Sequence, residues 1–348
     1  MSTTLEDEIA LKNFQDYLRI ETVHPKPDYY KCRDFLFGLA KELNWQHWEF
    51  EVAAGKPFVG FTIEGRNPSL ESLMLYSHTD VVPVENPQKW TYPPFSAHND
   101  GKTIFGRGTQ DMKCVGIQYV EALRRLKSRG VNQFERTIHI VFGPDEEIGG
   151  NDGMKRFIET EFYKKMNIGF ALDEGLATEG ETFIVYYAER CPWWVKFICK
   201  GSSGHGSRFI ENTAIAKFQF ILNKALEYRS SQENKLKCNP EFTIGNVTSL
   251  NCTKVDGGFQ INCVPETFEL NMDIRVTPTE DLEMLEQMLY SWAAEAGNGS
   301  DVEIDFIQKS LPTGKPTFDR NNIFVNAFAS SLENNGCPFK LEIFTGFY

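Results

Sequence analysis

Three short apolar runs constrain the fold of this chain more than any other feature. Residues 72–76 (SLMLY), 137–142 (TIHIVF) and 168–172 (IGFAL) are almost continuously apolar. Strands that are buried on both faces of a parallel sheet have this composition. Helical patterns lie between the runs, most clearly in residues 111–130, which end at Gly130, a residue typical of a helix C-cap. The alternation predicts an α/β fold with a doubly wound, mainly parallel sheet.

A different pattern begins after Arg190. It reads strand, helix, strand, strand, helix, strand, in residues 191–201, 212–232, 242–252, 266–276, 279–297 and 301–308. This order is the split βαβ arrangement of a small α+β sandwich. One more helix and one more strand follow and are expected to return to the first domain. We therefore predict that residues 189–309 form a domain inserted between residues 1–188 and 310–348.

Composition limits the classes of protein to which the chain can belong. With 348 residues it exceeds the size at which one core usually stops growing. Its net charge of -12 argues against nucleic acid and anionic membranes as partners. No run approaches the roughly 18 apolar residues of a membrane span. The acidic N-terminus does not resemble a signal peptide, and the eight cysteines are scattered, without a C-x-x-C pair. These features predict a cytoplasmic protein.

Polar residues that can bind metals follow each of the three apolar runs. They are His78 and Asp80 after the first run, Asp145, Glu146 and Glu147 after the second, and Asp173 and Glu174 after the third. Asp111 follows a glycine-containing stretch, GRGTQ, at the start of a predicted helix. Ligands bind outside the carboxyl ends of the strands in open α/β sheets, so we expect these residues to gather at one edge.

Each of these residues also has a simpler interpretation. A single histidine is more often a core residue than a ligand, Asp111 and Asp173 could be helix caps, and the PDEE segment could be a solvated turn. Together, however, so many carboxylates at one edge would repel each other unless a cation lay among them. One histidine with several carboxylates suits zinc, or less well manganese or cobalt. Two metals bridged by a carboxylate, about 3.5–4 Å apart, are common in such hydrolases.

The blocks SHTDVVP, WTYPPFSA, GRGTQDMKC, PDEEIGG and ALDEG resemble the signature blocks of the aminoacylase branch of the dinuclear zinc exopeptidase and deacylase family. The resemblance covers nearly the whole chain. It implies a homodimeric enzyme that uses two zinc ions per subunit to hydrolyse N-acyl-L-amino acids to a carboxylate and a free L-amino acid. It also implies that residues 1–188 and 310–348 form the catalytic metal-binding domain and residues 189–309 the dimerisation domain.

The resemblance assigns roles to the residues at the sheet edge. It implies His78, Asp111 and Asp173 on one zinc ion, with Asp111 bridging to a second ion held by Glu147. Asp80 would hydrogen-bond His78 and orient it, and Glu146 would be the general base. Spacing alone leaves open which of the two adjacent glutamates is the base.

The resemblance also assigns roles in the inserted domain. His205, in the loop GSSGHGS, would reach the partner subunit's site and stabilise the oxyanion, although the residue itself could be a simple exposed histidine. Asn262 and Arg275 would contact the substrate, with Arg275 binding its free carboxylate, although Arg275 could be a surface charge on a strand. For the remaining histidines, His24, His47, His98 and His139, the sequence indicates no functional partner.

The chain departs from the family pattern near its C-terminus. In the family the last strand leads into further elements and a late histidine that completes the second zinc site, whereas no histidine follows His205 here. The second site is therefore expected to be incomplete and the chain to be truncated. Two alternatives remain: a sibling dipeptidase or other N-deacylase, and a catalytically impaired chain that acts only as a dimerisation partner.

Overall fold

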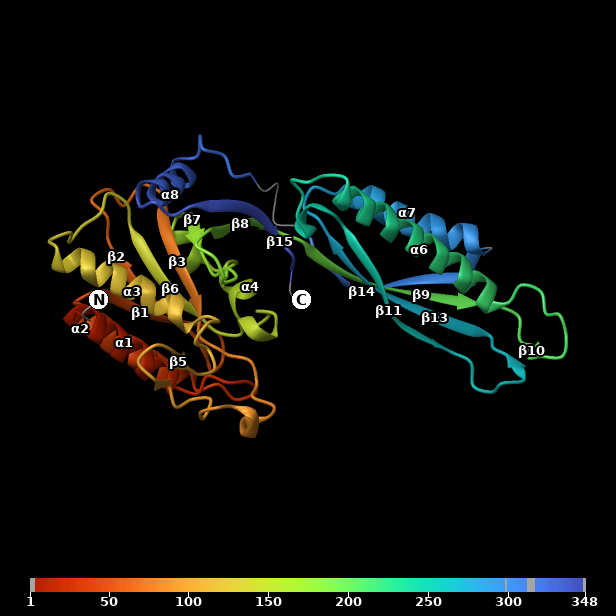
Figure 1. The fold of residues 1–348 in the computed structure, drawn as a ribbon, viewed down its shortest axis with the longest axis horizontal. Coiled ribbons are helices and arrows are strands. Elements are labelled where there is room, and N and C mark those ends of the chain that lie inside the picture. The colour runs from red at the N-terminus through yellow and green to blue at the C-terminus, as the bar shows by residue number, and fades with distance from the viewer. Residues whose placement is uncertain (1–3, 298, 312–316, 347–348) are drawn as a thin grey trace. The chain divides into compact units, whose positions relative to one another are not determined.

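The computed structural model describes residues 4–297, 299–311 and 317–346. The chain divides into two compact units, residues 1–177 and 178–348, and each has its own hydrophobic core (Figure 1). Among these described residues, no helix combines the length and apolar character that crossing a membrane requires.

The first unit is built on a five-stranded sheet with the order β1-β2-β6-β3-β7. Its strands are β1 (Gln46–Ala53), β2 (Lys56–Ile63), β3 (Ser72–His78), β6 (Ile138–Gly143) and β7 (Ile168–Leu172). The strands β6, β3 and β7 are parallel, whereas β2 is antiparallel to both β1 and β6. The three apolar runs thus form the parallel strands, and the predicted α/β class is confirmed.

Helices cover both faces of this sheet (Figure 1). One face carries α1 (Leu5–Leu18), α2 (Tyr29–Glu42) and α3 (Lys113–Ser128), and the other carries the short helices α4 (Met154–Phe157) and α5 (Glu161–Lys165). Successive residues of β6 alternate between the two cores: Ile140 and Phe142 belong to the first, and Val141 to the second. All three are fully buried, which explains why this strand is almost continuously apolar.

The parallel strands end at one edge of the sheet. His78, the last residue of β3, lies opposite Gly143, the last residue of β6, and Leu75 lies opposite Leu172 of β7. The chain therefore leaves all three strands at this edge, where the polar residues that follow each strand begin.

The second unit contains a four-stranded antiparallel sheet with the order β11-β13-β9-β14. The elements run in the chain order β9 (Cys191–Lys200), α6 (Ala214–Lys237), β11 (Ser249–Gly257), β13 (Thr267–Val276), α7 (Leu282–Ala296) and β14 (Val302–Lys309). Both helices pack on the sheet around buried residues such as Trp193 and Leu270. This arrangement confirms the predicted split βαβ order.

The remaining elements are short or lie apart from these two sheets. In the second unit, β8 (Phe183–Glu189) pairs in parallel with β15 (Phe339–Phe344), and α8 (Ile323–Asn334) precedes β15. Two short antiparallel pairs are β4 (His98–Asn99) with β5 (Ile104–Phe105), and β10 (Gly204–His205) with β12 (Cys263–Val264). Single 3-10 turns are η1 (Pro87–Lys89), η2 (Glu146–Ile148), η3 (Ile244–Asn246) and η4 (Gly299–Asp301). The division into residues 1–188, 189–309 and 310–348 stays a prediction.

Candidate metal centre

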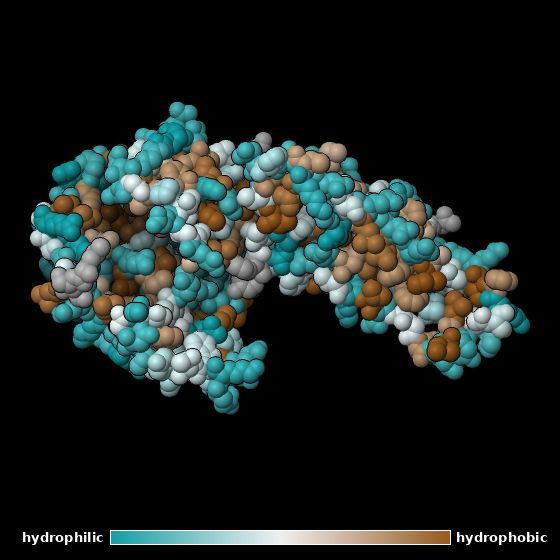
Figure 2. All heavy atoms as spheres, in the orientation of Figure 1, coloured by the Kyte–Doolittle hydropathy of each residue, from teal (hydrophilic) through white to brown (hydrophobic). Residues whose placement is uncertain are grey.

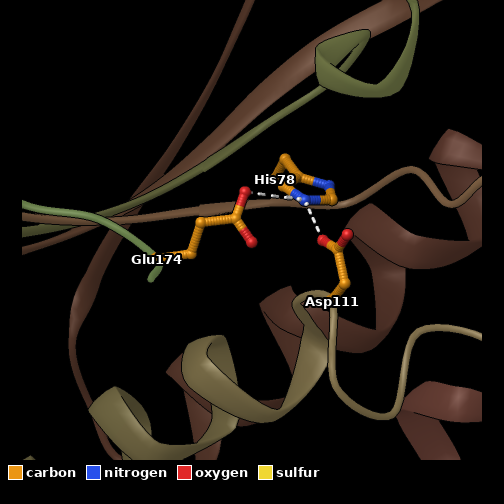
Figure 3. Close-up of side chains that lie close together, drawn as sticks. All are labelled: His78, Asp111 and Glu174. Carbon is orange, nitrogen blue, oxygen red and sulfur yellow. Dashed lines mark hydrogen bonds and ion pairs between the residues drawn. The ribbon is translucent and has the colours of Figure 1, made fainter. Parts of the chain in front are cut away.

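Three side chains at the carboxyl edge of the first unit's sheet form a group that could hold a metal ion: His78, Asp111 and Glu174 (Figure 3). The Nε2 atom of His78 lies 2.8 Å from Oδ1 of Asp111 and 3.5 Å from Oε1 of Glu174. The ligand atoms of the three residues all lie within 4.8 Å of one another. One imidazole nitrogen and two carboxylate oxygens form a donor set that suits zinc.

The electrostatics of His78 also favour a cation at this point. Burial of the ring acts to lower the pKa of His78, but hydrogen bonds with Asp111 and Glu174 outweigh it and raise the pKa well above its ordinary value. The surrounding carboxylates therefore stabilise a positive charge next to Nε2. A divalent cation bound by the same oxygens would supply that positive charge.

Asp111 is a candidate ligand and does not cap the helix that follows it. Helix α3 starts at Lys113 after Met112, and no side chain makes a capping hydrogen bond there. Instead, Oδ1 of Asp111 accepts a hydrogen bond from Nε2 of His78. The start of the helix is held by the fully buried Lys113, whose Nζ donates to the main-chain oxygens of Tyr17 and Ile20.

Asp80 contacts His78, but through its main chain. The Nδ1 atom of His78 lies 3.0 Å from the carbonyl oxygen of Asp80 and 3.7 Å from the carboxylate Oδ1. The carbonyl can only accept, so Nδ1 carries a proton when this hydrogen bond forms. The expected orientation of His78 by Asp80 therefore involves the backbone, and the Asp80 carboxylate is available for other partners.

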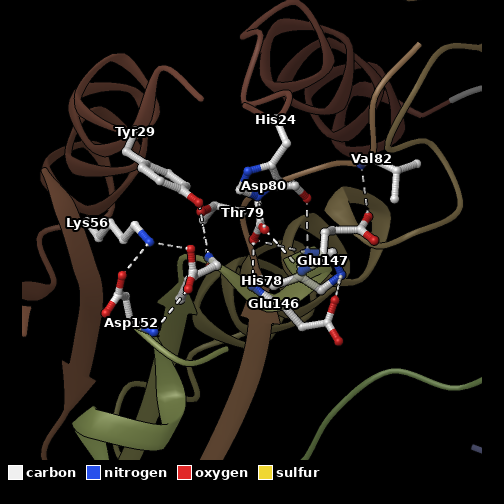
Figure 4. A network of polar contacts seen from close by, with 12 residues as sticks. His24, Tyr29, Lys56, His78, Thr79, Asp80, Val82, Glu146, Glu147 and Asp152 are labelled. Carbon is white, nitrogen blue, oxygen red and sulfur yellow. Dashed lines mark hydrogen bonds and ion pairs between the residues drawn. The ribbon is translucent and has the colours of Figure 1, made fainter. Parts of the chain in front are cut away.

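These partners belong to the acidic turn, which we define as residues 145–149 (Figure 4). The turn enters at Asp145 with φ 74° and leaves at Gly149 with φ 92°, both in the left-handed region. The N–H groups of Glu146 and Glu147 donate to Oδ1 and Oδ2 of Asp80 at 3.2 and 3.1 Å. Asp80 thus connects the main chain of the acidic turn to the imidazole of His78.

The two glutamates of the acidic turn have different surroundings. The Oε2 atom of Glu146 lies 3.8 Å from Nε2 of His78, whereas Oε1 of Glu147 accepts a hydrogen bond from the N–H of Val82 at 3.2 Å. Burial raises the pKa of Glu146 to about 7 against the opposing effect of His78, and burial and the charge of Asp111 raise the pKa of Glu147 to about 7. Carboxyl groups with such pKa values can exchange protons near neutral pH.

These pKa values predict how zinc binding depends on pH. In the metal-free protein the carboxyl group of Glu147, the expected zinc ligand of the two, holds its proton up to about pH 7, and a zinc ligand must be ionised. We therefore expect zinc affinity to increase as the pH rises through about 7, with protons released on binding from Glu147 and from Nε2 of His78, whose pKa is also raised. Calorimetry in buffers with different ionisation enthalpies measures this release. A zinc affinity that does not change with pH would contradict the prediction.

The structure brings Glu174, and not Asp173, into the group around His78. Strand β7 ends at Leu172, and the Asp173 carboxylate folds back so that its Oδ1 accepts a hydrogen bond from the N–H of Glu174 at 2.8 Å. The carbonyl of Asp173 also accepts a hydrogen bond from the hydroxyl of Tyr119 at 3.4 Å. The sequence predicted that both carboxylates lie at the end of this strand. Beyond the end of the strand, however, the sequence pattern no longer indicates which of two adjacent side chains points toward His78.

A pair of substitutions separates the two candidates. We expect Glu174→Ala to weaken zinc binding by at least about tenfold more than Asp173→Ala, because Oε1 of Glu174 lies 3.5 Å from Nε2 of His78, whereas the Asp173 carboxylate accepts the N–H of Glu174. Competition with a chromogenic chelator measures both dissociation constants. A larger effect of Asp173→Ala would assign the ligand to Asp173, as the sequence predicted.

A second residue that the sequence did not single out is His24. Its Nε2 atom lies 2.7 Å from Oδ2 of Asp80, and both side chains are buried. The two residues are 56 positions apart, and His24 lies outside every motif that pointed to the site. Only the fold could reveal this contact.

The other predicted site residues lie in the second unit. His205 is exposed on β10, where its Nδ1 pairs with Oγ of Ser207 at 2.8 Å. Asn262 is near it, because the N–H of Gly206 donates to the Asn262 carbonyl at 2.8 Å. Arg275 lies on β13, and its Nε and Nη2 bind the two carboxylate oxygens of Asp273. The roles predicted for His205, Asn262 and Arg275 remain predictions.

The fold and the site define the class of protein: an α/β protein with a candidate metal centre at the carboxyl edge of its sheet. The model of the peptidase family M20/M25/M40 matches residues 74–342, and the chain belongs to this family. It is 44% identical to human aminoacylase-1 over 318 residues, which cover 91% of this chain and 77% of the human protein. It is also 44% identical to aminoacylase-1 of Dictyostelium discoideum over 299 residues, or 82% of this chain and 72% of that protein.

Solved structures share the fold. A tripeptidase from Staphylococcus aureus superimposes with a TM-score of 0.68 at 19% identity, covering 99% of this chain and 86% of that one. The YXEP protein of Bacillus subtilis, a dinuclear metal-binding peptidase of the M20 family, superimposes with a TM-score of 0.64 at 15% identity. The superposition covers 98% of this chain and 84% of that one. The α/β architecture with a second α+β unit is therefore that of the family.

Proposed function

We propose that this protein hydrolyses N-acyl-L-amino acids to a carboxylate and a free L-amino acid, and that the reaction depends on zinc. The observation that carries the proposal is the position of Glu146, whose Oε2 lies 3.8 Å from His78 Nε2 and whose pKa is about 7. A proton acceptor of this strength beside a metal-binding group is what amide hydrolysis requires. The identity of 44% to human aminoacylase-1 supports the choice of substrate class.

The residues of the site would hold one metal ion and would supply two carboxylates to a second, so the second site is still expected to be incomplete. His78, Asp111 and Glu174 would hold one ion, because their ligand atoms are already close together. Asp111 and Glu147 would hold the other, since the charge of Asp111 raises the pKa of Glu147 and a cation between the two would relieve their repulsion. When bound, zinc polarises an amide carbonyl and makes water a nucleophile near neutral pH.

Glu146 would act as the general base and then as the general acid. It takes a proton from the water whose oxygen attacks the carbonyl carbon, and it later gives a proton to the amide nitrogen as the C–N bond breaks. Asp80 positions this base, because its carboxylate accepts the N–H groups of Glu146 and Glu147. Asp80 is therefore a positioning residue, and its loss would disturb both the base and His78.

Asn262 and Arg275 are proposed to contact the substrate, with Arg275 binding the free carboxylate of the amino-acid part. The guanidinium of Arg275 makes a two-point contact with the carboxylate of Asp273, at 2.7 and 3.0 Å. A substrate carboxylate would use the same planar geometry.

We infer that the protein forms a homodimer in which His205 stabilises the oxyanion in the partner subunit's site. Support comes from the exposed surface beside His205, where Phe209, Phe259 and Ile261 have almost fully exposed side chains. Figure 2 shows apolar side chains at the end of this unit where β10 lies. Exposed apolar groups of this kind mark contact surfaces. Sedimentation equilibrium decides the oligomeric state, and a monomer at all concentrations would contradict the dimer.

A reducing compartment such as the cytoplasm is the proposed location. All eight cysteines are free thiols, and Cys32, Cys191 and Cys199 are buried. Proteins of oxidising compartments more often pair such residues in disulfides.

Comparison of two substrates tests the proposed function. The purified, zinc-loaded chain is expected to hydrolyse N-acetyl-L-methionine faster than the dipeptide L-alanyl-L-methionine, and the Asp80→Ala variant is expected to hydrolyse neither at a comparable rate. Faster hydrolysis of the dipeptide would instead identify a sibling dipeptidase. A folded, zinc-loaded chain that hydrolyses neither substrate would contradict the proposal and favour a role as a dimerisation partner only.

A further inference from the structure

We propose that His24 is a positioning residue of the active site, which holds the carboxylate of Asp80 in the orientation that the acidic turn and His78 require. The kinetic test of this inference rests on the proposed function, whereas the contacts of His24 and the zinc-binding test rest on the geometry of the first unit. The Nε2 atom of His24 lies 2.7 Å from Oδ2 of Asp80, with 8% of the His24 side chain and none of the Asp80 side chain exposed (Figure 4).

The main chain places His24 beside Asp80. Val23 and Val81 form a parallel bridge, the N–H of His24 donates to the Val81 carbonyl, and the N–H of Val81 donates to the Thr22 carbonyl. These contacts join the segment after α1 to the segment after β3. The imidazole of His24 is therefore directed to Asp80 by hydrogen bonds that do not depend on its side chain.

The Asp80 carboxylate has more than one possible arrangement. Its Oδ1 accepts the N–H of Glu146 and its Oδ2 accepts the N–H of Glu147, but Oδ1 is also only 3.7 Å from Nδ1 of His78. A small rotation would let the carboxylate bind His78 and release the acidic turn. The short contact from His24 to Oδ2 opposes that rotation, because a hydrogen bond to an ionised acceptor is strong in a buried position.

His24 thus acts through Asp80 on two parts of the site. It keeps the Asp80 carboxylate on the acidic turn that carries Glu146, and it leaves the Asp80 carbonyl as the partner of His78 Nδ1. The carboxylate can only accept, so Nε2 of His24 carries the proton of this hydrogen bond. Partners of this kind, one step removed from the ligands, affect metal affinity and activity by about 10–100-fold.

Two substitutions of His24 separate a donor function from a space-filling one. His24→Leu keeps apolar bulk and removes the N–H donor, whereas His24→Gln places an amide N–H the same number of bonds from the main chain. His47→Leu is the matched control, because His47 is a partly buried histidine of the same unit whose Nδ1 contacts the Trp45 carbonyl. The measurements are kcat and KM for N-acetyl-L-methionine, the zinc dissociation constant and the melting temperature.

We expect His24→Leu to lower kcat by about 10–100-fold with little change in KM, and to weaken zinc binding, while His24→Gln restores most of both. We expect His47→Leu to behave like the wild type in kcat. A His24→Leu variant with wild-type kcat and zinc affinity would overturn the proposal. So would a His24→Gln variant as impaired as His24→Leu, since the N–H donor would then not be the feature that matters.

The zinc dissociation constant keeps the test independent of the proposed function. If the wild-type chain binds zinc but does not hydrolyse the substrate, the proposed function fails and His24 is judged on zinc binding alone. In the Asp80→Ala background, His24→Leu is expected to cause no further loss of zinc affinity, because the effect passes through Asp80. A full additional loss in that background would overturn the proposal.

Discussion

Replacing Glu146 by glutamine is expected to lower kcat for N-acetyl-L-methionine by about 10²–10⁴-fold, the usual contribution of a general acid–base group. The amide of glutamine can still occupy the space 3.8 Å from His78 Nε2, but it cannot take a proton from water. Because His78, Asp111 and Glu174 remain, zinc binding should be nearly unchanged. Steady-state kinetics of the zinc-loaded variant and chelator competition measure the two effects separately.

Two controls make this result specific. Glu161→Gln changes a carboxylate on α5 whose side chain is 78% exposed, and it should not affect kcat. Glu147→Gln should weaken zinc binding, since Glu147 is the proposed ligand and Glu146 the proposed base. If Glu146→Gln loses zinc and Glu147→Gln does not, the two roles are reversed. A Glu146→Gln variant with wild-type kcat would remove Glu146 from the mechanism.

Replacing Asp111 by alanine is expected to have the largest effect on metal binding. Asp111 is the proposed bridge between the two ions, and its Oδ1 lies 2.8 Å from His78 Nε2. Loss of a residue that only hydrogen-bonds a metal ligand typically weakens metal binding by about 10–100-fold. Removal of Asp111, a proposed ligand itself, should weaken zinc binding by more than this. Zinc content after dialysis and the chelator-measured dissociation constant test this prediction, and hydrolysis should be lost together with the metal.

The matched control is Asp34→Ala, which changes an aspartate on α2 whose side chain is 68% exposed. This variant should keep its zinc and its activity. The melting temperature of metal-free Asp111→Ala should stay close to that of the metal-free wild type, because no helix cap depends on Asp111. Full zinc content in Asp111→Ala would contradict the assignment of this residue as a ligand.

The part of the fold that leads to the site could be predicted from the sequence for a physical reason. Residues 72–76, 137–142 and 168–172 are apolar because both faces of their strands are covered, and such strands are parallel and meet at one edge. The polar residues that follow each run then fall at that edge. The prediction of a metal site at this position required no further knowledge of the fold.

The sequence could not indicate in the same way which of two adjacent carboxylates after the end of a strand faces the site. Strand periodicity assigns sides only while the strand lasts, and β7 ends at Leu172, so Asp173 and Glu174 were equivalent in the sequence. The two glutamates of the acidic turn were equivalent for the same reason. Their surroundings differ only because Asp145 adopts a left-handed conformation and Asp80 binds both N–H groups.

Sequence patterns could not predict contacts between segments that are far apart in the chain. Asp111 could be a cap or a ligand until the start of α3 was located at Lys113. His24 had no visible partner because it meets Asp80 through a bridge between Val23 and Val81. Such contacts depend on the packing of the segment after α1 against the segment after β3.

We propose that this chain hydrolyses N-acyl-L-amino acids with a metal bound by His78, Asp111 and Glu174. The most direct measurement is hydrolysis of N-acetyl-L-methionine by the purified chain before chelation, after removal of metal, and after addition of zinc. This assignment of the metal site predicts turnover that disappears with the metal and returns with zinc, and no recovery in Asp111→Ala. Turnover that persists without metal, or a folded zinc-loaded chain without turnover, would contradict it.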